Sequence, residues 1–98
     1  MVKGYWIARV DVYNVDGYKD YVTANGPVFA KYGAKFLVRA GKFENPEGKA
    51  RSRNVVIEFK DYETALACYK SPEYQALVAM RKPHGENDMV IIEGYDAP

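Results

Sequence analysis

The stretch from residue 53 to residue 81, RNVVIEFKDYETALACYKSPEYQALVAMR, constrains the fold more than any other part of the chain. Residues 54–60 alternate in polarity, with Val55, Ile57 and Phe59 on one side, which is typical of a half-buried strand. Asp61 is expected to cap a helix that follows. Ser71-Pro72 predicts the start of a second helix, because serine caps helix N-termini and proline suits the first helical position. A strand followed by two short helices indicates an α+β domain.

Three further segments have the pattern of strands. Residues 4–12 and 34–41 alternate between apolar and mixed positions and contain aromatic and β-branched residues. Residues 88–93 are expected to form the last strand. The predicted apolar face contains Trp6, Ala8, Val10, Val12, Phe36, Val38 and Ala40, and the mixed face contains Tyr5, Ile7, Arg9, Asp11, Lys35, Leu37 and Arg39.

A long helix is expected between the first two strands. Asp16 is the predicted N-cap, and Gly26-Pro27 predicts a kink or a division into two pieces, because proline cannot donate a helical hydrogen bond. Gly33 lies where a left-handed residue often ends a helix. Residues 43–52, with Pro46-Glu47-Gly48, predict a solvated hairpin loop, and residues 83–87 predict another loop.

The resulting order β-α-β-β-α-β predicts a single domain, residues 1–98, with the ferredoxin-like α+β fold. In that fold the first and third strands are central in a four-stranded antiparallel sheet, and the helices cover one face. The other face would then expose Tyr5, Ile7, Leu37 and Val56 among charged residues. That is much apolar surface for a domain of 98 residues. We therefore expect a homodimer in which the sheets of two protomers pack face to face.

The composition excludes several classes of function. Lysines and arginines number 14 and acidic residues 13, so there is no charge excess with which to bind nucleic acid. No signal peptide or long apolar span is present, which favours a cytosolic protein without a membrane partner. A single cysteine, Cys68, excludes an intrachain disulfide and a cysteine-based zinc site. Phosphate-loop, dinucleotide, serine-elbow and metal-ligand spacings are absent, and no cofactor or metal is expected.

Several motifs together resemble those of the domain-of-unknown-function family 1330. They are GYWIARVDV, NPEG, VVIEF, SPEYQ followed by an arginine, and IIEGY, and they cover nearly the whole chain. The resemblance implies a ferredoxin-like protomer that forms a dimeric α+β barrel. It implies little chemistry, because the family has no assigned activity. The wider superfamily includes cofactor-independent monooxygenases, muconolactone-isomerase-like enzymes, haem-degrading enzymes and ligand-binding domains, and the fold alone does not choose among them.

Arg9, Arg39 and Glu58 form the first candidate site. All three are predicted to lie on the mixed face, with the third strand between the first and second, so that an arginine flanks Glu58 on either side. Such a cluster could bind an anionic substrate and position Glu58 as an acid. The alternative, which is the more common case, is a salt-bridge network in the dimer interface.

His84, the only histidine, is a second candidate because imidazole titrates near neutral pH. Glu86 or Asp88 could orient it. A solvated loop histidine without catalytic function is the more common alternative.

Six tyrosines on the helices could line an aromatic cleft between helices and sheet, namely Tyr18, Tyr21, Tyr32, Tyr62, Tyr69 and Tyr74. The more common alternative is that they cover the edge of the core. Arg81 could close a ligand pocket, or could bind helix carbonyls or the carboxylate of Glu73 or Glu93.

The sequence therefore leads to two hypotheses. In the first, a small aromatic or carboxylic molecule binds, or is transformed without a cofactor, between sheet and helices. Glu58 and His84 would then be catalytic, and Arg9, Arg39, Tyr32 and Arg81 would bind the substrate. In the second, the protein is a non-catalytic dimeric module whose charged face serves assembly.

Overall fold

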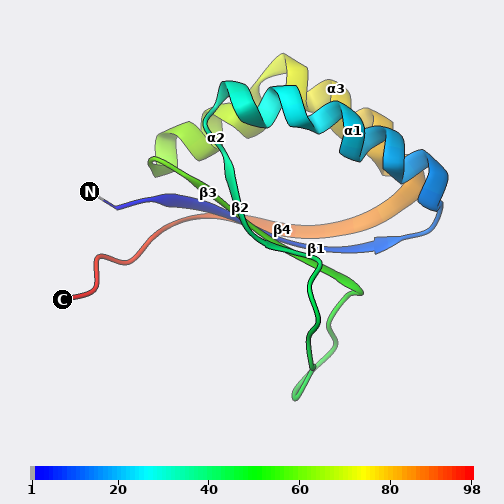
Figure 1. Ribbon diagram of the computed structural model, residues 1–98, viewed down its shortest axis with the longest axis horizontal. Helices are drawn as coiled ribbons and strands as arrows, with labels where there is room; N and C mark the ends of the chain where they lie inside the picture. The colour runs from blue at the N-terminus through cyan, green and yellow to red at the C-terminus, as the bar shows by residue number, and fades with distance from the viewer. Residues whose placement is uncertain (1) are drawn as a thin grey trace.

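The computed structural model describes residues 2–98 and consists of a four-stranded antiparallel sheet with helices on one face (Figure 1). The strand order is β2-β3-β1-β4, so that the first and third strands are central, as predicted. The connection between β2 and β3 projects from the side opposite the helices. The elements are β1 (Gly4–Val12), α1 (Val15–Lys31), β2 (Lys35–Arg39), β3 (Arg53–Phe59), α2 (Tyr62–Lys70), α3 (Pro72–Arg81), the 3-10 helix η1 (Lys82–His84) and β4 (Gly85–Glu93).

The first helix begins earlier than the sequence predicts. Asn14, in an extended conformation, is the N-cap of α1, and its side chain accepts a hydrogen bond of 3.2 Å from the backbone N–H of Gly17. Asp16 already lies in the first helical turn, so its prediction as the cap is wrong. The helix is also not divided at Gly26-Pro27, because α1 continues to Lys31. Gly33 adopts the predicted left-handed conformation, with φ of 66°.

The caps of the next two helices agree with the prediction. The Asp61 carboxylate accepts a hydrogen bond of 2.8 Å from the Thr64 N–H. Hydrogen bonding by the Thr64 side chain and backbone lowers the pKa of Asp61. The Ser71 hydroxyl accepts from the Tyr74 N–H at 3.2 Å and donates to the Cys68 carbonyl at 2.7 Å. A single side chain thus ends α2 and starts α3.

Residues 83–87 do not form the predicted loop. After η1, β4 begins at Gly85 and pairs with the last residues of β1, with Gly85 opposite Val12 and Asn87 opposite Val10. A Cβ on Gly85 would lie 2.6 Å from the Asp11 carbonyl oxygen, so this close approach requires glycine. Because β1 extends to Val12, residues 85–87 pair with it and become part of the sheet.

A β-bulge in β2 overturns the predicted faces of Val38 and Arg39, whereas Lys35 and Phe36 lie on the faces predicted for them. The register shifts between Phe36 and Val38, so that Val38 pairs with Val56 and Arg39 pairs with Val55. The extra residue, Leu37, reverses the alternation of side chains that follows it. Val38 therefore lies on the face away from the helices, and Arg39 lies on the helix face.

Trp6 is at the centre of the core between sheet and helices. Its indole N–H donates a hydrogen bond of 2.9 Å to the Ala65 carbonyl, and its ring packs edge-on against Phe29, Tyr69 and Tyr74. Cys68 is fully buried nearby, and burial raises the pKa of its thiol to about 12. None of the helices within residues 2–98 combines the length and apolarity that a membrane crossing requires.

Candidate functional site

A cavity lies between the sheet and the helices α1 and α3, and it has an apolar end and a polar end. Trp6, Ile57 and Phe36 form one row across β1, β3 and β2 at the apolar end. Arg53, Val10 and Asn87 form a second row across β3, β1 and β4 at the polar end. The helices add Tyr18, Tyr21, Asn25, Phe29, Tyr74 and Arg81 to the lining.

The polar end contains buried side-chain atoms that have no hydrogen-bond partner within residues 2–98. These are Nε of Arg53, Nε of Arg81 and Oδ1 of Asn87. Arg81 is only 6% exposed. No carboxylate within residues 2–98 forms an ion pair with either guanidinium. Glu73, which the sequence suggested as a partner of Arg81, pairs with Lys31 at 2.7 Å. Buried polar groups are usually hydrogen-bonded, and unpaired ones indicate a strained or functional site.

The two arginines lie over tyrosine rings. The guanidinium carbon of Arg53 is 5.6 Å from the ring centre of Tyr18, and that of Arg81 is 5.6 Å from the ring centre of Tyr21. Such cation–π contacts offset part of the cost of burying the charge. Burial raises the pKa of Tyr18, although both arginines act in the opposite direction. The Tyr18 hydroxyl is therefore neutral near pH 7 and can donate a hydrogen bond.

Tyr21 and Tyr74 form a hydroxyl pair with an O···O distance of 2.6 Å. Burial raises the pKa of Tyr74, so its hydroxyl is also uncharged near pH 7. One hydroxyl proton is used within the pair, and the other remains available to a further acceptor. The site can thus offer guanidinium and phenol donors, together with the amide groups of Asn25 and Asn87, above an aromatic floor.

The free space of the cavity is small in this conformation. Its water-accessible space is about 30 Å³, which is enough for one or two water molecules. A surface depression of about 450 Å³ shares Tyr18 and Arg53 with the cavity, and another of about 400 Å³ shares Arg81, Asn87 and Met89 with it. Arg53 and Arg81 therefore each line both the cavity and a depression beside it.

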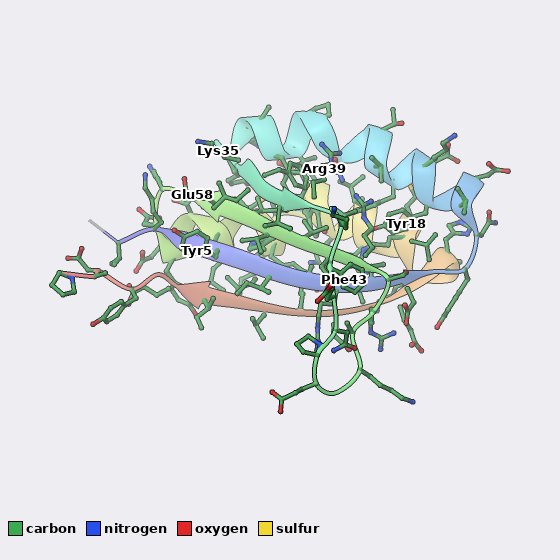
Figure 2. The ribbon with its side chains drawn as sticks, turned by 60° about the horizontal axis from the view of Figure 1, so that its bottom comes forward. Tyr5, Tyr18, Lys35, Arg39, Phe43 and Glu58 are labelled. Atoms are coloured by element: carbon green, nitrogen blue, oxygen red, sulfur yellow. The ribbon has the colours of Figure 1, made fainter. Side chains whose placement is uncertain are left out.

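The predicted cluster of Arg9, Arg39 and Glu58 is not formed. Glu58 lies on the open face of the sheet, opposite Tyr5 and Lys35, and the Tyr5 hydroxyl donates to its carboxylate at 3.3 Å. Figure 2 shows these three residues in a row across β1, β3 and β2. Arg9 is on the same face but opposite Asn54 and Asp88. The bulge places Arg39 on the helix face.

Of the other predicted residues, Arg81 and three helix tyrosines, Tyr18, Tyr21 and Tyr74, line the cavity, whereas His84 and Tyr32 do not. The carbonyl of His84 accepts hydrogen bonds from the Tyr13 and Asn14 N–H groups at 2.7 and 3.2 Å, and its ring packs against Gly17. His84 thus packs η1 against the start of α1. Tyr32 lies at a different surface depression, with the Lys31 ammonium 5.6 Å from its ring centre.

The sequence analysis missed three polar residues of the site. Arg53 shares the parity of Val55 and Ile57, and a charged residue on an otherwise apolar strand face was the available signal. Asn25 lies in the same helical stripe as the tyrosines of α1. Asn87 was missed because residues 83–87 were predicted to be a loop. Within the described chain, no group of His, Cys, Asp or Glu gathers that could hold a metal.

The open face of the sheet carries an apolar band. It crosses the four strands in one row, formed by Val38, Val56, Ile7 and Val90. Ile7 is 41% exposed and Val90 is 54% exposed. The Tyr5–Glu58 hydrogen bond flanks the band at one end.

Arg51 organises the other end of the open face. It forms ion pairs with Asp88 at 2.8 Å, Glu86 at 2.9 Å and Asp11 at 2.7 Å, and these carboxylates raise the pKa of Arg51. The pairs join β1 and β4 to the base of the connection between β2 and β3. An apolar centre with charged groups at both ends is the usual composition of a protein–protein interface.

The sequence profile of a family described as a domain of unknown function, DUF1330, matches residues 3–95. The chain belongs to this family. No curated protein matches the DUF1330 chain at a comparable level. The family assignment agrees with the observed fold, but it assigns no activity to the chain.

Solved structures with the same fold include proteins from three bacteria. A protein of unknown function from Rhodopseudomonas palustris is 20% identical, with 99% of this chain and 85% of that chain covered and a TM-score of 0.71. SnoaB, a cofactor-independent oxygenase from Streptomyces nogalater, is 9% identical, with 99% and 97% covered and a TM-score of 0.66. A dimeric ferredoxin-like protein of unknown function from Thermobifida fusca is 17% identical, with 94% and 89% covered and a TM-score of 0.60.

Proposed function

We propose that this DUF1330 protein binds a small aromatic or carboxylic molecule in the cavity between sheet and helices, without a cofactor. The observation that carries the proposal is the group of buried polar atoms without partners at one end of an aromatic cavity. Ligand sites in proteins have this composition, with a few convergent polar groups in an apolar concavity. Glu58 and His84 are not part of the proposal, because neither lines the cavity.

Binding requires the cavity to open. Arg53 is half-buried and borders the outer depression of about 450 Å³, and its long side chain can move without unfolding the strand that carries it. A shift of Arg53 and Tyr18 would join that depression to the cavity. Ligand binding would then select an open conformation of the same fold.

Saturable binding that depends on the cavity tests this proposal. Ala8 lines the cavity, and Ala8→Leu should fill its free space and abolish the binding of small aromatic molecules. Ala67→Leu, at an exposed position on α2, is the matched control. Isothermal titration of a panel of one-ring and two-ring aromatic acids, phenols and quinones measures the affinity. Equal affinity in both variants would place the ligand elsewhere, and no binding by the wild type would reject the proposal.

Turnover forms a second part of the same experiment. Because SnoaB, which has this fold, is a cofactor-independent oxygenase, each ligand is also incubated aerobically with the protein. Mass spectrometry would detect oxygenated product. Ala8→Leu should lose any activity that arises in the cavity.

We also propose that two protomers pack through the open faces of their sheets. The band of Val38, Val56, Ile7 and Val90 supports this arrangement, because exposed apolar surface of this kind is usually covered by a partner. The fold is shared with a dimeric protein from Thermobifida fusca. The cytosolic location inferred from the sequence stays a prediction.

A second candidate function is a dimeric module without a ligand. The small water-accessible space of the cavity, about 30 Å³, favours it. In that case the wild type binds none of the panel, yet it still dimerises through the open face. The titration and a measurement of oligomeric state together distinguish the two functions.

A further inference from the structure

We infer that the ligand of the cavity is an organic carboxylate whose anionic group lies between Arg53 and Arg81. This inference rests on the proposed function and narrows it to one class of ligand. The aromatic or apolar body of the ligand would extend toward Trp6 and Phe36 at the other end of the cavity.

The charge balance of the polar end supports an anion. Arg53 comes from β3 and Arg81 from α3, and both line the cavity although no acid within residues 2–98 pairs with them. Burying an unpaired cation costs free energy, and this cost increases when two guanidinium groups line the same cavity. A carboxylate supplies two acceptor oxygens and one negative charge, which suit the two free Nε–H donors.

The tyrosines of the cavity add donors but no negative charge. Burial raises the pKa values of Tyr18 and Tyr74, so neither provides an internal counter-ion for the arginines near pH 7. The hydroxyl pair of Tyr21 and Tyr74 keeps one proton for an outside acceptor. The polar end thus offers mainly hydrogen-bond donors, whereas a cationic ligand would meet like charges.

The way into the cavity is also basic. Lys19, Arg39 and Arg53 line the depression of about 450 Å³, together with Val12, Val15, Tyr18 and Val22, and this set contains no acid. Figure 2 shows Arg39 and Tyr18 on the side of the sheet that α1 covers. Arg39 reaches this position because of the bulge in β2, and its guanidinium carbon lies 4.1 Å from the ring centre of Phe36 in the cavity wall. A basic mouth attracts anions and speeds their association.

The inference is tested on the full chain with ligands that share one ring system and differ in the charge of their substituent. Benzoate, benzamide and benzylamine share one ring, and 1-naphthoate, 1-naphthamide and 1-naphthylmethylamine share two. Trp6, the only tryptophan, lines the cavity, so ligand binding changes its fluorescence. We expect at least one carboxylate to bind about 10-fold or more tightly than its amide, because only the carboxylate neutralises the arginines. The amine should not bind.

Arginine variants locate the anion. Arg81→Met and Arg53→Met keep an unbranched apolar side chain similar to the arginine stem and remove the guanidinium. Each should weaken carboxylate binding by about 10-fold or more with little effect on the amide. Lys49→Met, at an exposed position in the connection between β2 and β3, is the control and should bind as the wild type does. If Arg81→Met does not fold, the less buried Arg53→Met and the charge series still decide the question.

The outcomes separate this inference from the proposed function. Equal binding of amide and carboxylate, unchanged in both arginine variants but lost in Ala8→Leu, would overturn the anion and keep the cavity as a ligand site. Binding of no carboxylate, amide or other member of the panel would overturn both. Charge-selective binding that Lys49→Met weakens as much as Arg53→Met would also overturn the inference, because the selectivity would then reflect overall charge.

Discussion

Burial in the core makes the thiol of Cys68 a pH-sensitive element of stability. The residue has no exposed surface, and burial raises its pKa from the ordinary 9.0 to about 12. In the unfolded chain the thiol loses its proton near its ordinary pKa, whereas in the folded protein it keeps it. The contribution of the protonated Cys68 thiol to the free energy of unfolding is therefore complete below pH 9, and it is lost as the pH rises from about 9 toward 12.

We predict that the free energy of unfolding decreases with pH above about 9. Cys68 alone should contribute a slope of up to about 1.4 kcal/mol per pH unit in that range. Tyr18 and Tyr74 act in the same direction at higher pH, because burial raises their pKa values too. Urea unfolding between pH 7 and pH 10.5 measures the slope, and Cys68→Ala should reduce it. An identical slope in Cys68→Ala would show that the buried thiol does not titrate in this way.

Single residues also show which parts of the site the sequence could predict. Arg81 was a correct candidate for the cavity lining, because helical spacing places it on the same face as Tyr74. Arg53 and Asn87 were missed because their positions depend on where strands begin. Strand ends are determined by pairing with a distant segment, and local sequence contains little of that information.

At the scale of elements, the starts of α2 and α3 were predictable, whereas the start of α1 and the strand irregularities were not. Asp61 and Ser71 act through hydrogen bonds to residues three positions away, so the pattern is complete within a few residues. The bulge at Leu37 depends on how β2 pairs with β3, which lies beyond a long connection. The alternation of hydrophobic residues therefore predicted β2 correctly as a strand but assigned Val38 and Arg39 to the wrong faces.

We predict that Ser71→Ala destabilises the protein by about 1 to 2 kcal/mol. The substitution removes the N-cap of α3 and also the hydrogen bond that Ser71 donates to the Cys68 carbonyl, and both groups are buried. Thermal and urea unfolding measure the change. Thr23→Ala, at an exposed position within α1, is the control and should stay within about 0.5 kcal/mol of the wild type. Equal effects of the two substitutions would contradict a capping function of Ser71.

At the scale of the whole molecule, the sheet separates two surfaces with different properties. The helix face forms the core and the cavity, and the open face carries the apolar band between two charged ends. The sequence predicted both the ferredoxin-like fold and the unusual apolarity of the open face, because period-two alternation reports which residues share a face. It did not predict the charged cluster around Arg51, which unites residues that lie far apart in the chain.

We predict that Ile7→Glu prevents the proposed dimer from forming. The substitution puts a charge in the centre of the apolar band, where face-to-face packing would bury it without a partner. Met80→Glu on α3 is the matched control, because Ile7 and Met80 are both 41% exposed. Sedimentation velocity should show monomers for Ile7→Glu and dimers for the wild type and Met80→Glu. Dimerisation of Ile7→Glu with wild-type affinity would exclude the open face as the interface.

Because side chains alternate along β1, this one strand contributes residues both to the cavity and to the open face. Ala8 lines the cavity, while its covalent neighbours Ile7 and Arg9 belong to the open face. A change in the twist of this strand that widens the cavity also changes the surface offered to a second protomer. Because linkage between two binding events is reciprocal, dimerisation and ligand affinity would then depend on each other, and the apparent ligand affinity would vary with protein concentration.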